Sequence, residues 1–262
     1  MKTLAFIVGL FFALAPEAYS QLRIKDLAKD RAEEIMEDLA GVMAHTTASG
    51  ASSLGKKFGF EVGVLASYAE TPNIDRIVER SGGDTDYDAL PNAGILGRIG
   101  ITEWVVLEGV YFPNTDFGEY NIDIGSLAAQ VILIREDPLN FALKAFYTNS
   151  ILSYEQINDN LRANVELEND IYGIQALISK KIFIFEPYFG AGLVTNKGEI
   201  RVSGAATIFN ERLARSGSVK IDGNSTQLFA GTEIDLWIMN LGVEVGELYG
   251  NTRGSVKVTF GF

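Results

Sequence analysis

The amino-acid sequence predicts an all-β protein: a ten-stranded antiparallel up-and-down transmembrane β-barrel that follows a short N-terminal amphipathic helix. Three observations carry this prediction. Apolar residues alternate with polar or small ones along many segments, long and short connections alternate between these segments, and most segments have about the 9 to 11 residues of a membrane-spanning strand. Eight or twelve strands are the nearest alternatives, because the connections 70–91 and 195–226 could each contain a hairpin.

The first twenty residues have the pattern of a secretory signal peptide. Lys2 gives a positive start, Leu4 to Ala15 is a run of apolar and glycine residues, and Ala18 and Ser20 are the small residues that precede a cleavage site. The run is too short for a transmembrane helix, which needs about 20 residues. We therefore expect residues 1–20 to be removed on export, residues 21–55 to form a helix and linker, and residues 56–262 to form the barrel.

Residues 22–44 predict an amphipathic helix, because apolar residues recur there at spacings of three and four. A single helix cannot bury its apolar stripe alone, so we expect it on the periplasmic side of the barrel or inside the lumen. The small polar segment 45–55 is expected to be a linker, with His45 in contact with solvent.

Alternation with a period of two begins at Phe58, as in a strand with one apolar face. The last strand is the clearest, with Val256, Val258, Phe260 and Phe262 on one face. The predicted strands are 58–68, 93–102, 104–112, 122–134, 139–148, 171–179, 182–194, 227–238, 241–248 and 255–262.

The two faces of these strands differ in a way that favours lipid outside and polar groups inside. The polar face is rich in glycine and poor in charge, which suits the cramped interior of a narrow barrel. The apolar face is continuous from strand to strand and carries aromatic residues towards its ends, as in an aromatic girdle. A soluble barrel would instead expose many charged residues on its outer face.

By strand parity, nine ionisable side chains are expected to line the lumen: Glu61, Arg98, Glu108, Lys144, Glu186, Glu233, Asp235, Glu244 and Lys257. Six acids against three bases would leave some negative potential. These groups line a narrow, cation-favouring path in one interpretation and form a salt-bridge network that plugs the barrel in the other. Trp104, Phe146, Phe229 and Trp237 share the inward parity and would narrow the lumen.

Composition limits the possible chemistry. The net charge of −12 argues against nucleic-acid binding, and the absence of cysteine excludes thiolate chemistry. The single histidine, His45, has no neighbouring partner in the sequence for a catalytic dyad, so we expect neither an enzyme nor a cofactor. Asp84, Asp86 and Asp88 are a weak candidate for a divalent metal site, but Ala89 and Ile95 replace the glycine and glutamate of a calcium-binding loop.

The segment PYFGAGLV at 187–194 and the terminal strand SVKVTFGF resemble those of small Gram-negative outer-membrane β-barrel proteins, over about residues 58–262. The stretch YGIQALISKKIFIFEPYFGAGL is also similar to an uncharacterised, porin-like group of such barrels with an N-terminal helical segment. The resemblance implies location in the outer membrane, contact with its lipid and lipopolysaccharide, and periplasmic chaperones during export. It also implies that the barrel assembly machinery reads Val256, Val258, Phe260 and Phe262 as its signal.

Two functions follow as expectations. The first is porin-like passive passage of small solutes through a narrow, mildly cation-favouring lumen. The second is a non-conducting barrel that anchors long acidic outer loops for surface interaction or envelope integrity. A lipid-modifying enzyme is a distant third, because enzymatic barrels of this kind rely on a histidine on the barrel, and His45 is expected in the linker.

Overall fold

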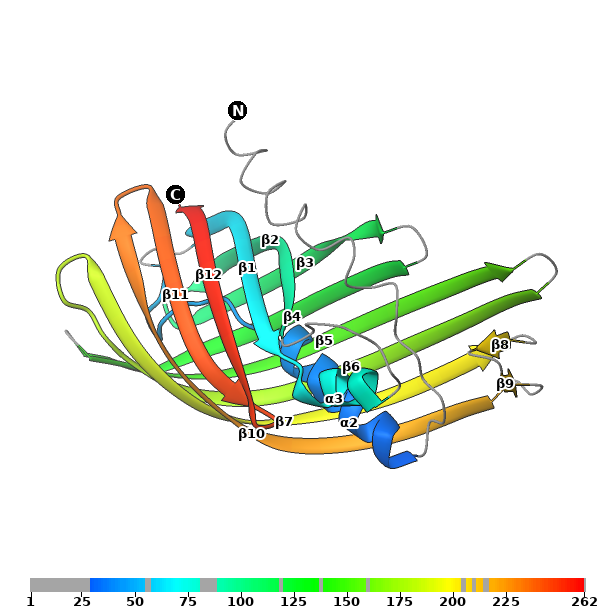
Figure 1. Cartoon of the computed structure of the whole chain (residues 1–262). Coiled ribbons are helices and arrows are strands. Elements are labelled where there is room, and N and C mark those ends of the chain that lie inside the picture. The colour runs from blue at the N-terminus through cyan, green and yellow to red at the C-terminus, as the bar shows by residue number, and fades with distance from the viewer. Residues whose placement is uncertain are drawn as a thin grey trace.

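Ten antiparallel strands close into a single barrel in the computed structural model, which describes residues 29–54, 58–80, 89–117, 120–136, 139–158, 161–203, 206–208, 211–213 and 217–261. Around the barrel the strand order is β1-β12-β11-β10-β7-β6-β5-β4-β3-β2 (Figure 1). The strands are β1 (Phe60–Glu70), β2 (Ala89–Thr102), β3 (Val105–Phe117), β4 (Tyr120–Glu136), β5 (Leu139–Asn158), β6 (Leu161–Lys180), β7 (Phe185–Ser203), β10 (Gly217–Leu236), β11 (Met239–Leu248) and β12 (Asn251–Gly261). The predicted ten-stranded up-and-down barrel is confirmed.

The two long connections contain secondary structure but add no strand to the barrel. Between β7 and β10, the short strands β8 (Ala206–Ile208) and β9 (Glu211–Leu213) pair with each other as a separate two-stranded sheet. Between β1 and β2 lies the helix α3 (Pro72–Arg80). The twelve-stranded alternative therefore does not apply to this chain.

The barrel wall is uneven in height. β5, β6 and β10 have 20 residues and β7 has 19, whereas β1 and β12 have 11 and β11 has 10. Much of the predicted loops 149–170 and 195–226 is therefore strand, and the prediction of long loops there was wrong. We call the projecting part the sheet extension; it comprises residues 149–158, 161–171, 195–203 and 217–226.

The sheet extension was missed because its hydropathy pattern is the reverse of the pattern in the membrane. Lower in β6, the apolar Ile174 points outward and is exposed, while Gln175 points inward and is buried. Higher in the same strand, Leu167 is buried on the inner face and its neighbour Glu168 ion-pairs with Arg201 in partly exposed surroundings. Such a reversal is expected where a strand leaves lipid for water.

At the end opposite the sheet extension no connection between barrel strands is longer than residues 181–184, whereas both long connections, 71–88 and 204–216, lie at the sheet-extension end. We call the former the short-turn end. Two-residue turns at 103–104 and 237–238 lie here, β1 begins here and β12 ends here. Trp104 and Trp237 occupy these turns and are exposed, Trp237 at 95%, so their predicted inward orientation was wrong. A turn does not follow strand parity, and Trp237 has a positive φ of 74°.

The outer surface carries an apolar band between two levels of aromatic residues. Exposed apolar side chains such as Val64, Leu127 and Leu193 face outward along the middle of the strands. The exposed aromatics at the short-turn end include Phe58, Phe60, Trp104, Phe183, Phe185, Trp237 and Phe260, and those towards the sheet extension include Tyr68, Tyr111, Tyr147 and Tyr172. An apolar band with an aromatic girdle at each rim is the surface that a membrane-spanning barrel presents to lipid.

Small residues on the inner face make room for large aromatic ones. A Cβ on Gly173 would lie 2.1 Å from the ring of Phe146, and a Cβ on Gly190 would lie 2.1 Å from the ring of Phe229. Phe146 and Phe229 are both buried, in agreement with their predicted inward parity. Each ring therefore lies against the inner wall, over the glycine opposite it on the neighbouring strand.

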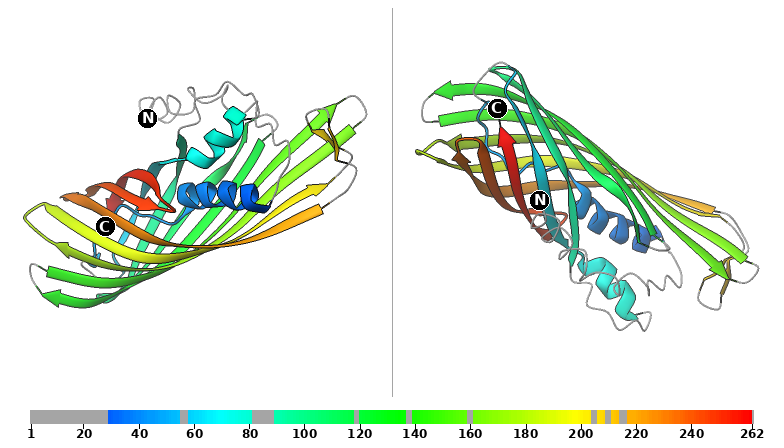
Figure 2. Two further views of the ribbon diagram at one scale, coloured as in Figure 1. Left: turned by 60° about the horizontal axis from the view of Figure 1, so that its bottom comes forward. Right: turned by 90° about the horizontal axis from the view of Figure 1, so that it is seen from above.

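The N-terminal helix α2 (Lys29–Met43) lies in the interior of the barrel, against the inner face of its wall and at the level of the sheet extension (Figure 2). Its buried apolar residues pack in one cluster with inward residues of the sheet extension, including Leu167, Ile171, Ile200 and Ile221. The helical prediction is confirmed for Lys29–Met43, and residues 22–28 lie outside the described residues. In the part of the chain that the structure describes, no helix is long and apolar enough to cross a membrane.

Candidate functional site

The candidate site is the lumen, which is occupied by the segment 29–54, here called the plug. The plug consists of α2 followed by residues 44–54, which form no regular secondary structure. Every residue from Asp38 to Ala51 is buried. The predicted linker is therefore not a solvated connection but part of the barrel interior.

The centre of the site is a row of three charged side chains across neighbouring strands. Glu61 of β1 lies directly opposite Arg98 of β2, and Arg98 lies directly opposite Glu108 of β3. Arg98 Nη1 donates to Glu61 Oε2 at 2.7 Å and Arg98 Nε donates to Glu108 Oε1 at 3.0 Å. The register of the sheet thus places a cation between two carboxylates, all of them buried.

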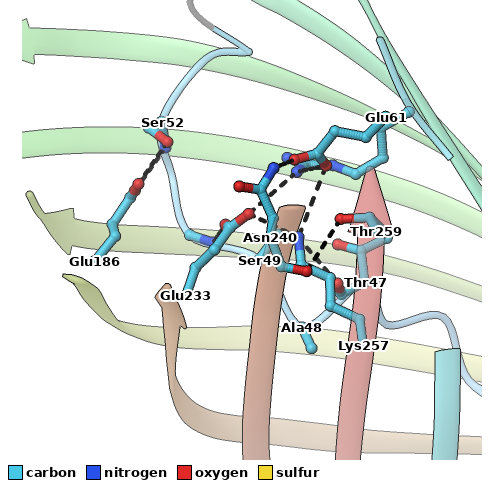
Figure 3. Close-up of polar contacts among 12 residues, drawn as sticks. Thr47, Ala48, Ser49, Ser52, Glu61, Glu186, Glu233, Asn240, Lys257 and Thr259 are labelled. Carbon is cyan, nitrogen blue, oxygen red and sulfur yellow. Dashed lines mark hydrogen bonds and ion pairs between the residues drawn. The ribbon is translucent and has the colours of Figure 1, made fainter. Parts of the chain in front are cut away.

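Two lysines complete the neutralisation of these carboxylates. Lys144 Nζ lies 2.8 Å from Glu108 Oε2, and Lys257 Nζ lies 2.8 Å from Glu233 Oε1 and 3.7 Å from Glu61 Oε2. Figure 3 shows Glu61, Glu233 and the plug residue Ser49 around the ammonium group of Lys257, which donates to Ser49 Oγ at 2.5 Å. Asn240 Nδ2 also donates to Glu61 Oε1. The charges are therefore shared among several strands instead of forming isolated pairs.

The plug supplies hydroxyl groups to the remaining carboxylates. Thr46 Oγ1 donates to Glu244 Oε1 at 2.7 Å, and Ser52 Oγ donates to Glu186 Oε2 at 2.6 Å (Figure 3). The backbone N–H of Ser52 donates to the other oxygen of Glu186 at 3.1 Å. The small polar composition of residues 45–52, which suggested a flexible linker, instead satisfies buried acids in a narrow space.

His45 is buried, so the prediction of a solvated linker histidine was wrong. Its Nε2 lies 3.2 Å from Glu108 Oε2 and its Nδ1 lies 2.7 Å from Ser126 Oγ, with the ring stacked on Phe146 at a centroid distance of 5.7 Å. A carboxylate only accepts, so in the neutral imidazole Nε2 donates to Glu108 and Nδ1 accepts from Ser126. Sequence distance hid this arrangement, because Glu108 and Ser126 lie 63 and 81 residues away.

A serine, a histidine and a carboxylate in contact could form a nucleophilic triad. Here the side chains of His45 and Glu108 have no exposed area, and Ser126 is also buried. Glu108 is already engaged by Arg98 and Lys144. In this arrangement the three groups hold the plug to β3 and β4 and offer no surface to a substrate.

The structure gathers eight of the nine predicted lumen residues in the interior. They are Glu61, Arg98, Glu108, Lys144, Glu186, Glu233, Glu244 and Lys257, and all are buried. Asp235 lies apart from them at the short-turn end, where its carboxylate pairs with Lys181 at 3.2 Å and its side chain is 47% exposed. It precedes the turn at 237–238, where the strand has reached the rim of the barrel.

A fourth buried base, Arg253, was not predicted. It lies on the inner face of β12, and its Nη2 donates to the carbonyl of Ala44 in the plug at 2.9 Å. Among the described residues, its Nε and Nη1 have no hydrogen-bond partner. The sequence assigned residues 249–254 to a loop, although the parity of Lys257 and Ser255, extended backward, would have placed Arg253 inside. Among the described residues of the barrel wall, five buried acids therefore face four buried bases, instead of the predicted six against three.

The carboxylate of Asp38 makes four hydrogen bonds that fix α2 near the sheet extension. Its Oδ2 accepts from the backbone N–H groups of Asn73 and Ile74 in the first turn of α3, at 2.8 and 2.9 Å. Its Oδ1 accepts from the side-chain amides of Asn73 and Asn251, at 2.9 and 2.8 Å. Asp38 thus caps α3 from a different helix and ties α2 to the first residue of β12.

The remaining sequence candidates lie on the surface or outside the described residues. Val256 and Phe260 of the predicted assembly signal are exposed on the outer face of β12, and Val258 is partly exposed there. Phe262 and the weak metal candidates Asp84, Asp86 and Asp88 lie outside the described residues.

A closed ten-stranded barrel with an apolar outer band, two aromatic levels and a charged, filled interior defines an outer-membrane β-barrel protein. Within this class the chain belongs to a family described as a family of unknown function (DUF6588), whose model matches residues 78–260. No curated protein matches the chain.

Several solved outer-membrane barrels are similar in structure. The outer membrane protease OmpT from Escherichia coli has 8% sequence identity and a TM-score of 0.48; the match covers 82% of this chain and 100% of the OmpT chain. The translocator domain of the autotransporter NalP from Neisseria meningitidis has 10% identity and a TM-score of 0.44, covering 79% and 89%. The attachment invasion locus protein Ail of Yersinia pestis has 12% identity and a TM-score of 0.32, covering 78% and 97%. Identities this low carry no information about activity.

Proposed function

We propose that this protein is a non-conducting, non-enzymatic outer-membrane barrel that anchors the sheet extension and its connections at the cell surface. The observation that carries the proposal is the occupied lumen. Residues 38–51 of the plug are buried, and the plug contacts Glu108, Glu186, Glu233, Glu244 and Lys257 directly. A solute would have to displace these contacts before it could pass.

The sheet extension supports a role at the surface. Its outer face carries a charged group in which Arg201 pairs with Glu166, Glu168 and Glu199 at 2.7 to 2.9 Å. The side chain of Arg201 is 46% exposed and these acids are partly exposed as well. A tall, charged sheet above the lipid band offers a rigid surface for a protein or lipopolysaccharide partner, whereas passive passage requires no such structure.

Porin-like passage is the second candidate. The buried charges favour it only if the plug leaves the lumen. Five acids and four bases would line the lumen if the plug left it, which is a weak preference for cations. Passage therefore requires plug displacement, and the two candidates predict different behaviour of the intact protein.

Conductance in planar bilayers separates them. The wild-type protein, with folding verified by its heat-dependent mobility on detergent gels, is expected to be silent. Ser52→Asp places a second carboxylate against Glu186 and should produce openings, because two like charges at this partly buried position repel each other. Ser52→Asn has nearly the same shape without the charge and should remain silent. Discrete, cation-selective steps from the wild-type protein would refute the proposal in favour of porin-like passage.

A further inference from the structure

The contacts of the plug follow a strict order along the barrel wall. On β12, which runs from the sheet extension to the short-turn end, Asn251 contacts Asp38, Arg253 contacts Ala44 and Lys257 contacts Ser49. The plug and β12 therefore run in the same direction, from the sheet extension towards the short-turn end.

A second strand gives the same direction independently. On β7, which runs the opposite way, Glu186 near the short-turn end contacts Ser52. Gly198, in the sheet extension, lies against Met36, because a Cβ there would meet the Met36 side chain at 2.5 Å. The low-numbered end of the plug is therefore at the sheet extension, and its high-numbered end is at the short-turn end, where β1 begins.

Membrane barrels place their short turns in the periplasm and their longer connections outside the cell. From this orientation and the two contact series we infer that the plug crosses the outer membrane inside the barrel, with the Lys29 end of α2 on the cell-surface side. The barrel thus presents the N-terminal end of α2, together with α3, at the surface. This inference concerns the path of the chain and holds whether or not the barrel conducts.

The exposed contacts of α2 agree with this placement. Glu34 of α2 lies 4.0 Å from Arg76 of α3, and their side chains are 39% and 46% exposed, whereas Asp38, one turn further along, is buried. The polar side of α2 is partly exposed at Glu33, Glu34 and Glu37, whereas Ala32, Ile35 and Met36 on its apolar side stay buried and every residue from Asp38 to Ala51 is buried. The Lys29 half of the helix is therefore the half with access to solvent.

The order in which the barrel closes explains how this path can form without threading. The plug directly precedes β1, and the barrel closes only when β1 pairs with β12, the last strand. Until that pairing forms, the sheet is open along one edge, and the plug can bind its inner face. Closure then encloses the plug, so no chain end has to pass through a completed barrel.

Single-cysteine labelling in intact cells tests the inference, because the chain has no cysteine of its own. The probe is a maleimide on a polyethylene glycol chain too large to cross the outer membrane. Glu34→Cys reports on α2, Lys220→Cys on the exposed face of the sheet extension, and Lys181→Cys on the short-turn end, where the lysine side chain is 50% exposed. Labelling after denaturation confirms that each cysteine is present and reactive.

We expect Glu34→Cys and Lys220→Cys to be labelled in intact cells, and Lys181→Cys only after the outer membrane is permeabilised. Failure of Glu34→Cys to react in intact cells in which Lys220→Cys reacts would overturn the inference. Reaction of Lys181→Cys in intact cells would overturn the assumed orientation of the barrel, and with it the inference. Conductance in bilayers is a separate measurement, so failure of the proposed function would leave these labelling results unchanged.

Discussion

The two halves of the lumen are filled by one continuous segment but with opposite chemistry. Near the short-turn end, residues 45–52 of the plug meet a group of buried charges centred on Arg98. Near the sheet extension, α2 buries an apolar stripe against Leu167, Ile171 and other inward residues of the wall. We refer to these as the inner half and the outer half of the lumen.

The difference shows two ways of fixing the same segment. In the inner half, strand register sets Arg98 between Glu61 and Glu108, and side chains from other strands reach these groups, so the interaction depends on position and on complete pairing. In the outer half, the interaction depends on the apolar area removed from water, about 25 cal/mol per Å². Substitution of one side chain should therefore lower the free energy of unfolding most where it leaves a buried charge without its partner.

The largest effect is expected from Arg98→Leu in the inner half. This change leaves Glu61 and Glu108 buried with one cation fewer between them, and breaking a buried pair costs about 3–5 kcal/mol. Urea unfolding of the barrel in lipid vesicles measures the loss. Arg135→Leu is the matched control, because its pair with Glu103 is exposed and should be worth less than about 1 kcal/mol. Equal losses of unfolding free energy in the two variants would show that the buried ion pairs of Arg98 contribute no more to stability than an exposed pair.

The next effect is expected from Met36→Ala in the outer half. Met36 is fully buried against Gly198, and a cavity of this kind costs about 2–4 kcal/mol. Amide hydrogen exchange should accelerate in α2 and α3, while the barrel strands of the inner half remain protected, because the cavity lies only in the outer half. Leu127→Ala on the lipid-facing surface is the control, and it should change the exchange rates neither of α2 and α3 nor of the strands in the inner half. A uniform loss of protection would contradict the division of the lumen into two halves.

Strand parity predicted the inner half well. A period of two places the side chains of Glu61, Arg98, Glu108 and Lys144 on one face, and a barrel has only one inside. Asp235 departs from this pattern because it lies beside a turn, and Arg253 was missed because its segment was assigned to a loop. Both cases arose where the end of a strand was misjudged.

The outer half could not be predicted in the same way. The sheet extension has polar residues outside and apolar residues inside, so a search for apolar outer faces ends the strands at the lipid boundary. The helical pattern of α2 was recognisable, but its position depends on contacts such as those from Asp38 to Asn73 and Asn251, 35 and 213 residues away. Burial of His45 likewise follows from long-range packing, which a local pattern does not contain.

The smallest effect concerns Asp38 and the pH dependence of the outer half. Burial raises the pKa of Asp38 above its ordinary value of 3.8, since loss of water disfavours the carboxylate more than its hydrogen bonds to Asn73, Ile74 and Asn251 favour it. The folded state then binds the proton more tightly than the unfolded state. The contribution of Asp38 to stability is therefore full below pH 3.8 and is lost as the pH rises through the raised pKa.

Asp38→Asn removes this contribution, because an amide does not titrate. It also removes the negative charge of Asp38, which together with burial raises the pKa of Glu37, so the difference between the two proteins includes this effect of Asp38 on its neighbour. Hydrogen exchange of α2 and α3, divided by the intrinsic rate at each pH, measures the difference. Wild-type protection relative to Asp38→Asn should fall as the pH rises above 3.8 and then level off. The inner half, held by interactions that do not include Asp38, should show the same pH dependence in both proteins. A constant ratio between the two proteins in α2 and α3 would mean that the carboxylate is held as firmly in its charged form as in its neutral one, and that burial of Asp38 does not make the outer half sensitive to pH.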